Sequence, residues 1–151
     1  MPGMDVLGKR PSTKEGEHFR ANVWHWRPIA IYCERLAPTF TDWKTWHYND
    51  GVGLSEKRAN ELADILQAEM DSGRTAEYQK DWVNEQMALP DETCWLCNGT
   101  GRLRRDDRLT RCNACSGKGK RRPHETYYPF DIAAVAEFIQ FLRGCGGFEI
   151  W

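Results

Sequence analysis

Apolar residues recur at helical spacing in four stretches of the chain, and each stretch begins at a residue that favours a helix start. Pro28 suits the first turn of the first helix. Ser55, Thr75 and Asp131 are N-cap residues for the other three. The four apolar stripes are, in chain order, Ile29, Tyr32, Cys33 and Leu36; Ala59, Leu62, Ala63, Leu66 and Met70; Tyr78, Trp82 and Leu89; and Ile132, Val135, Ala136, Ile139 and Leu142.

Glycine and proline mark the ends of these helices. Gly73 has the C′ position of the second helix, and Pro90 stops the third. The short joint between these two helices predicts a helical hairpin. After the last helix, residues 148–151 alternate apolar and polar side chains as a short terminal strand does. The predicted fold class is therefore mainly α (α+β), with a small helical body.

Two copies of the motif C-x-x-C-x-G-x-G occupy residues 94–101 and 112–119. Four thiols in two C-x-x-C pairs at this spacing fit a closed, tetrahedral, structural site for one Zn²⁺. The predicted ligands are Cys94, Cys97, Cys112 and Cys115. Glycines allow positive φ and close backbone approach, so that amide N–H groups can point at the thiolates. The turn glycines are Gly99, Gly101, Gly117 and Gly119.

The motifs divide the chain into three parts. Residues 94–122, here called the zinc lobe, are predicted to form an inserted β-hairpin zinc-knuckle lobe, with residues 105–108 at the hairpin tip. Residues 18–93 and 123–151 form the helical body. Residues 1–17 contain several Pro and Gly among mixed charges, which predicts a flexible N-terminal arm that is either an untethered tail or a docking arm.

Charge is unevenly distributed, although the whole chain carries only −1. The zinc lobe has nine Lys or Arg and two Asp, a formal charge of +7, which leaves −8 for the remainder. A zinc tetrathiolate, worth −2, reduces the lobe to about +5. These cations are the candidate partner-binding residues, or they offset the charge of the thiolates. They are Arg102, Arg104, Arg105, Arg108, Arg111, Lys118, Lys120, Arg121 and Arg122.

The repeated motif resembles the cysteine-rich zinc domain of DnaJ-type co-chaperones. That resemblance implies the same four cysteines as ligands and the same four glycines as turn residues. The family has four motifs and two zinc sites, whereas this chain has two motifs, enough for one site. No His-Pro-Asp tripeptide occurs, so the J-domain signature is absent and a co-chaperone role is not implied. The remaining landmarks, such as residues 49–54 and 141–148, resemble uncharacterised small proteins of bacteria and their phages.

Three functions follow from these observations. The first is a zinc-stabilised, non-enzymatic binding protein that acts through a protein or nucleoprotein partner, with a phage-encoded inhibitor of a host defence complex as a special case. Aromatic residues and Arg anchor interfaces, and seven Trp are present, of which at least half are expected in the core. The second is a nucleic-acid-binding protein that uses the basic zinc lobe.

The third is an enzyme with an unrecognised site, built from His18, His25, His47 and His124 with Cys33 and Cys145. No recognisable catalytic motif is visible, and four cysteines leave zinc no open position for water. Cys33 is expected as a small buried apolar residue, and a helix C-terminus is expected to raise the pKa of Cys145. Neither a membrane span nor a secretory h-region is found in the sequence, and zinc-type cysteine spacing fits a reducing compartment. We therefore expect a cytoplasmic protein, in the host cytoplasm if phage-encoded, with no membrane partner and no small-molecule substrate.

Overall fold

A four-stranded antiparallel sheet, in the order β2-β1-β8-β3, joins strands from both ends of the chain. The computed structural model describes residues 4–21 and 23–151. Val6 lies opposite Phe19 on one side and Ile150 on the other, and all three side chains are buried. The strands are β1 (Met4–Gly8), β2 (His18–Ala21), β3 (Gly53–Ser55) and β8 (Gly147–Ile150).

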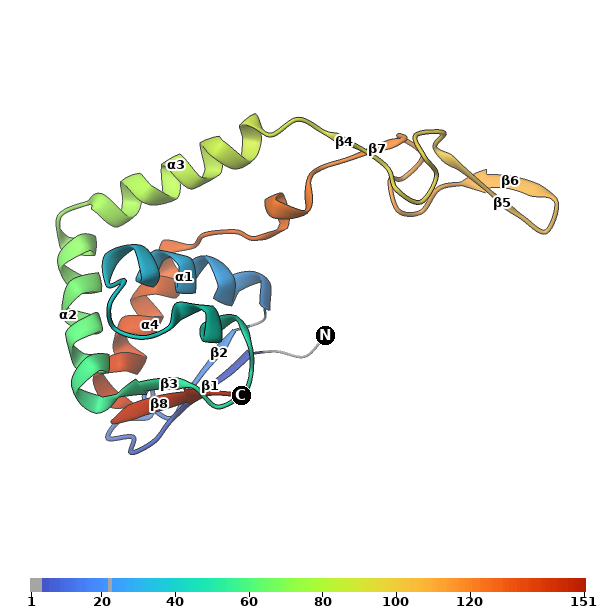
Figure 1. Ribbon diagram of the computed structural model, residues 1–151. Coiled ribbons are helices and arrows are strands. Elements are labelled where there is room, and N and C mark those ends of the chain that lie inside the picture. Colours follow the sequence, from blue (N-terminus) through green and yellow to red (C-terminus); the bar gives the residue numbers. More distant parts are fainter. Residues whose placement is uncertain (1–3, 22) are drawn as a thin grey trace. The chain divides into compact units, whose positions relative to one another are not determined.

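Four α-helices accompany this sheet among the described residues, so the predicted α+β fold class is confirmed. They are α1 (Val23–Leu36), α2 (Glu56–Asp71), α3 (Arg74–Ala88) and α4 (Ile132–Gly144), with short 3-10 helices η1 (Trp43–His47) and η2 (His124–Tyr127). Helix α2 packs against α4, and both α1 and α4 contact β2. Figure 1 shows α1 and α4 over one face of the sheet.

Two predicted N-caps are present in the structure. The Ser55 side chain accepts a hydrogen bond from the Arg58 amide at the start of α2, and the Asp131 carboxylate accepts one from the Ala133 amide at the start of α4. Each cap satisfies an amide that the first helical turn leaves without a partner. Local side-chain chemistry therefore sets both helix starts.

The other two helices begin earlier than predicted. Helix α1 starts at Val23, so Pro28 lies inside it, and α3 starts at Arg74, so Thr75 lies within its first turn. Burial explains the first difference, because the Trp26 ring is buried against Trp46 and its Nε1–H donates to the Trp46 carbonyl at 2.7 Å. Packing of a large aromatic side chain outweighs the cost of one proline.

The expected flexible arm over residues 1–17 is wrong for its described part. β1 pairs with both β2 and β8, and the amides of Lys9, Arg10 and Ser12 donate to carbonyls between Gly144 and Gly147. Met4 and Val6 alternate with less buried residues and enter the core. The pairing partner β8 lies at the other end of the sequence, so composition alone misses it. Residues 1–3 of that arm lie outside the described residues.

The chain divides into two units. Unit 1 is Met1–Val83 with Tyr128–Trp151, and unit 2 is Asn84–Tyr127, which extends beyond the predicted zinc lobe on both sides. Unit 2 holds two antiparallel pairs, β4 (Glu92–Thr93) with β7 (Lys120–Arg121) and β5 (Arg102–Arg105) with β6 (Arg108–Arg111). Asp106 and Asp107 form the tip of the β5–β6 hairpin with φ of 51° and 63°. The apolar core of unit 1 and the cysteine cluster of unit 2 are separate clusters.

Candidate metal centre

The four cysteines of the repeated motif converge at one point in unit 2. Their Sγ atoms all lie within 4.8 Å of one another, and all four residues are buried. Within residues 4–21 and 23–151, no other group of three or more His, Cys, Asp or Glu has this arrangement. All four are free thiols, so the cluster is held by packing and not by disulfide bonds.

The sulfur–sulfur distances fit a tetrahedral metal ion. Zn–S bonds of about 2.3 Å in a regular tetrahedron place neighbouring sulfurs about 3.8 Å apart. The Sγ atoms of Cys94 and Cys112 are 3.9 Å apart, and those of Cys97 and Cys115 are 3.7 Å apart. The four cysteines can therefore hold a metal ion, and the cluster fits a zinc-finger-like unit.

The two motifs have nearly the same backbone conformation, related by a shift of eighteen residues. The Cys94 amide donates to the Gly119 carbonyl at 2.9 Å, and the Cys112 amide donates to the Gly101 carbonyl at 2.9 Å. Asn98 and Ser116, at matching positions, both have φ of 53°. Each motif thus closes onto the end of the other. The cluster therefore has an approximate twofold arrangement. It relates Cys94 to Cys112 and Cys97 to Cys115, the same pairs that the sequence repeat relates.

Gly101 and Gly119 bring the two motifs together. Their amides donate to the Sγ atoms of Cys97 and Cys115, each at 3.2 Å. A Cβ atom on Gly101 would lie 2.5 Å from the Gly117 carbonyl oxygen, and one on Gly119 would lie 2.4 Å from the Gly99 carbonyl oxygen. Both residues also have positive φ, at 76° and 75°. No other residue type fits these positions, as the motif predicted.

These amides change the acidity of the thiols. Burial opposes ionisation of Cys97, but hydrogen bonds to its sulfur, led by the one from the Gly101 amide, outweigh burial and lower its pKa to about 6. Burial likewise opposes ionisation of Cys115, yet the Gly119 amide and neighbouring thiols lower its pKa. Burial raises the pKa of Cys112. The second cysteine of each C-x-x-C pair, Cys97 or Cys115, is thus stabilised as a thiolate, the form that binds metal.

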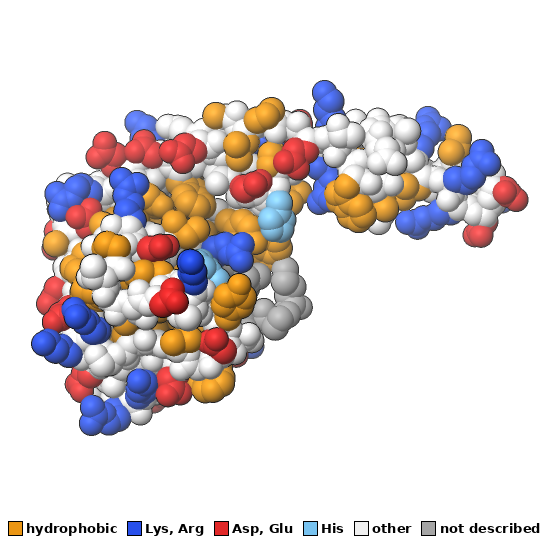
Figure 2. All heavy atoms as spheres, viewed as in Figure 1, with side chains coloured by type: hydrophobic (Ala, Val, Ile, Leu, Met, Phe, Trp, Pro, Cys, Tyr) orange, Lys and Arg blue, Asp and Glu red, His pale blue; other side chains and the backbone are white. Residues whose placement is uncertain are grey.

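The nine candidate partner-binding cations have two different roles in the structure. Four are engaged within unit 2: Arg105 with Asn113, Arg111 with the Ser116 carbonyl, Arg121 with the Tyr127 hydroxyl, and Arg122 with the carbonyls of Gln86 and Leu89 and with Asp91. Arg122 therefore caps the C-terminus of α3. The side chains of the other five make no hydrogen bond or ion pair within the described chain: Arg102, Arg104, Arg108, Lys118 and Lys120. Figure 2 shows Lys and Arg side chains along the zinc lobe.

Unit 2 also has a surface hollow that the sequence pattern did not identify. It lies beside β4 and β7 and is lined by Glu92, Thr93, Trp95, Arg121, Arg122, His124 and Tyr127. Trp95 is 69% exposed although it lies between two buried cysteines. A Trp inside the first C-x-x-C pair is the sequence signal that could have indicated this hollow, because so short a knuckle leaves a large side chain little room to be buried.

The residues considered for an enzyme site do not form one cluster. Cys33 and Cys145 are fully buried, and burial raises the pKa of each thiol. His18 contacts Asp5 at 2.9 Å, and burial lowers the pKa of His47. Cys33 is thus the small buried residue that was predicted. Burial, more than the expected helix dipole, makes Cys145 a weak acid.

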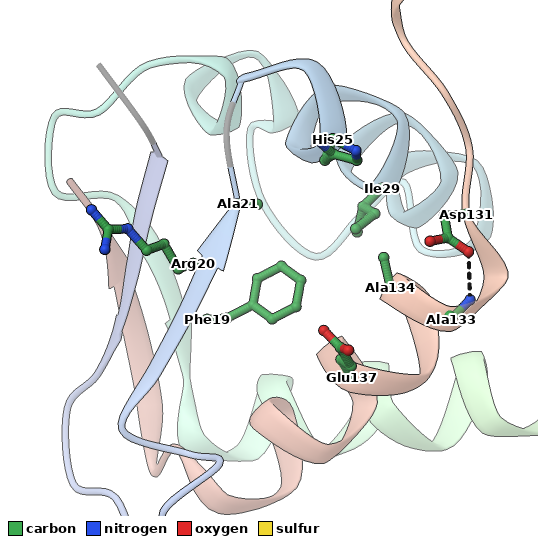
Figure 3. Close-up of a pocket in the computed structure, with 9 residues that line it drawn as sticks. All are labelled: Phe19, Arg20, Ala21, His25, Ile29, Asp131, Ala133, Ala134 and Glu137. Carbon is green, nitrogen blue, oxygen red and sulfur yellow. Dashed lines mark hydrogen bonds between the residues drawn. The ribbon is translucent and has the colours of Figure 1, made fainter. Parts of the chain in front are cut away.

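A second hollow, in unit 1, contains His25. It is lined by residues of β2, α1 and α4, and its apolar residues include Phe19 and Ile29 (Figure 3). Two carboxylates border it. Asp131 is engaged as the cap of α4 through the Ala133 amide at 2.9 Å, and Glu137 lies in the second turn of the helix. The hollow contains one histidine and no cysteine, so it does not assemble a thiol–imidazole pair.

Comparison with known proteins assigns no family to this chain, because no protein family model, curated protein or solved structure matches it. Among the described residues, no helix is both long enough and apolar enough to cross a membrane.

Proposed function

We propose that this protein is a zinc-stabilised, non-enzymatic binding protein that contacts a macromolecular partner through its zinc lobe. The observation that carries the proposal is a closed set of four thiols whose spacing matches a tetrahedral metal ion, in a unit whose exposed surface is basic and aromatic. Four protein ligands leave the metal no position for water or substrate, so its role is to hold the lobe folded.

Zinc is the metal that this donor set favours. Tetrahedral tetrathiolate sites hold zinc or iron, and Cys₄ sites with paired C-x-x-C spacing are typical of structural zinc. The repeated motif also resembles half of the cysteine-rich domain of DnaJ-type co-chaperones, and the proposal takes only the ligand set from that resemblance. The special case of this proposal is a phage-encoded protein that acts as an inhibitor by occupying a host defence nucleoprotein.

The unpaired cations support the binding role. If the Arg and Lys side chains served only to offset the thiolate charge, they would be expected to contact groups within the lobe itself. Five of the nine instead extend from unit 2 without an intramolecular partner, and Trp95 and Leu109 are exposed among them, at 69% and 60%. Exposed aromatic residues next to Arg are typical of the residues that dominate binding energy at interfaces.

Metal analysis and partner capture with one pair of variants test this function. Purified wild-type protein is expected to contain one zinc and no iron per chain, and Cys97→Ser is expected to lose the metal and the ability to retain partners from a lysate of the native host. The control is Cys33→Ala, which removes a buried thiol from unit 1 and is expected to keep both the metal and the partners. Equal capture by wild type and Cys97→Ser would show that the zinc lobe is not the binding element.

A further inference from the structure

The hollow on unit 2 combines aromatic faces with a guanidinium group. Its volume is about 250 Å³. Trp95 and Tyr127 line it and are 69% and 42% exposed, and the His124 ring lies edge-on to Tyr127 with the ring centroids 6.2 Å apart. Bare aromatic surface of this kind is costly in water unless a ligand covers it. Nucleic-acid bases are ligands that stack on such rings irrespective of sequence.

Arg121 is fixed at the edge of this aromatic surface. Its Nη2 donates to the Tyr127 hydroxyl at 3.3 Å, and its backbone pairs with that of Glu92 in the β4–β7 ladder. A planar guanidinium held beside a ring can stack on a base or donate two parallel hydrogen bonds to a phosphate. Glu92 repels a phosphate within the hollow, whereas its carboxylate can accept hydrogen bonds from the amino group of a base. The hollow therefore suits a base better than a phosphate.

The cations that surround the hollow suit the backbone that would carry such a base. Lys118 and Lys120 lie three and one residues before Arg121, are exposed, and their side chains make no hydrogen bond or ion pair within the described chain. On the β5–β6 hairpin, the side chains of Arg102 and Arg104 likewise have no hydrogen-bond or ion-pair partner within the described chain and lie on the face opposite Leu103, which packs against the cysteine cluster. The lobe keeps about +5 of charge with zinc bound. This positive charge complements a polyanion.

We propose that unit 2 binds single-stranded nucleic acid, with one base stacked in the hollow between Trp95 and Tyr127 and the flanking phosphates on Lys118 and Lys120. This inference rests on the proposed function, because it names the partner of the same zinc lobe. A duplex must unpair and unstack a base before that base can enter the hollow, which costs a few kcal/mol and favours a single strand. The preference for single strands separates this mode of binding from general attraction of the basic lobe to any nucleic acid.

Fluorescence anisotropy with labelled oligonucleotides tests the inference on the zinc-loaded full-length chain. The probes are a short mixed-sequence single-stranded RNA, the DNA of the same sequence, and the corresponding duplexes. Single strands are expected to bind tighter than duplexes, and affinity is expected to fall as salt rises. Trp95→Ala is expected to weaken binding about tenfold or more, since base stacking on one ring is worth that much. The control Trp151→Ala removes a half-exposed Trp from unit 1 and is expected to have no effect.

The lysines have a matched control as well. The double variant Lys118→Ala/Lys120→Ala is expected to reduce the slope of log affinity against log salt by about 1 to 2. Lys57→Ala/Lys80→Ala removes the same charge from exposed positions of unit 1 and is expected to leave the slope unchanged. Zinc content of every variant is measured in parallel, so that loss of the fold is not mistaken for loss of a contact.

Equal binding of duplex and single strand, or wild-type affinity in Trp95→Ala, would overturn the inference. If no oligonucleotide binds but the wild type still captures a nuclease-resistant protein that Cys97→Ser does not, the partner is a protein: this inference fails and the proposed function stands. If the chain binds neither, both fail.

Discussion

At the four-cysteine centre, single atoms decide whether the site forms. Gly101 and Gly119 each donate an N–H to a cysteine sulfur and each approach a carbonyl of the other motif closely. The thiolates of Cys97 and Cys115 are stabilised by the same two amides that fix the turns. Fold and ligand chemistry therefore depend on the same glycines, and two predictions follow from that dependence.

Gly101→Ala is expected to lower zinc affinity by about tenfold or more, because positive φ and a backbone clash add strain of about 1–3 kcal/mol. Gly99→Ala is the matched control. It has the same kind of φ, at 86°, but its Cβ would come no closer than 3.3 Å to the Thr93 methyl group and 3.9 Å to the Gly119 carbonyl oxygen, so a smaller loss is expected. Chelator competition measures both affinities. Equal losses would mean that the close approach to the Gly117 carbonyl has no energetic role.

Acidification is expected to release the metal only below about pH 6. The pKa of Cys97 lies below its ordinary value, at about 6, so the thiolate form is favoured above that pH and protons compete with the metal only as pH falls through it. A chromogenic chelator added across a pH series measures the release. Titration of the metal-free protein tests the cause directly: a Cys97 thiol that ionised near the ordinary value of about 8.5 would contradict the stabilisation of the thiolate by the Gly101 amide.

At the scale of elements, strand β1 is the largest departure from the sequence-based expectation. It pairs with β2 and β8, so residues that were expected to be a flexible arm form an inner strand of the sheet.

Val6→Ala is expected to lower the free energy of unfolding by about 2 kcal/mol, because the Val6 side chain is fully buried. Leu7→Ala, at the next position and 40% exposed, is the control and is expected to cost less than half as much. Denaturant unfolding measures the free energy of unfolding of both variants. Indistinguishable unfolding curves would contradict a role for β1 in the core.

For the whole molecule, two separate apolar clusters imply two separable units. The core of unit 1 contains no residue of the cysteine cluster, and that cluster contains no residue of the core. Helices α2 and α4 and strand β8 contribute to the first cluster only.

Metal removal is therefore expected to unfold the zinc lobe and leave unit 1 folded. Metal binding supplies folding free energy to small sites of this kind, and the four Cys side chains with Leu96, Leu103 and Ala114 are too few to replace it. Hydrogen–deuterium exchange before and after chelation is expected to show lost protection in residues 94–119 and unchanged protection in α2, α4 and β8. Loss of protection in both units would show that the metal holds the whole chain together.

Much of the fold and of the metal site could be predicted because the signals are local. Ser55 and Asp131 cap helices within a few residues of themselves, and the two C-x-x-C pairs fix sulfur positions within tight turns. Helix α1 was misplaced at its start because the burial of Trp26 against Trp46 depends on residues twenty positions apart. Arg122 was grouped with surface cations because its acceptors, the carbonyls of Gln86 and Leu89, are more than thirty residues away in sequence.

The sequence by itself determined the four clustered cysteines, the glycines of their two motifs and the starts of helices α2 and α4, since short-range spacing and turn chemistry dictate each of these. Only the tertiary structure placed β1 inside the sheet and brought Trp95, Tyr127 and Arg121 to one hollow. It also showed that Arg122 is engaged at the end of α3 and is not free for a partner. Each of those outcomes depends on contacts between residues distant along the chain, which periodicity and spacing do not encode.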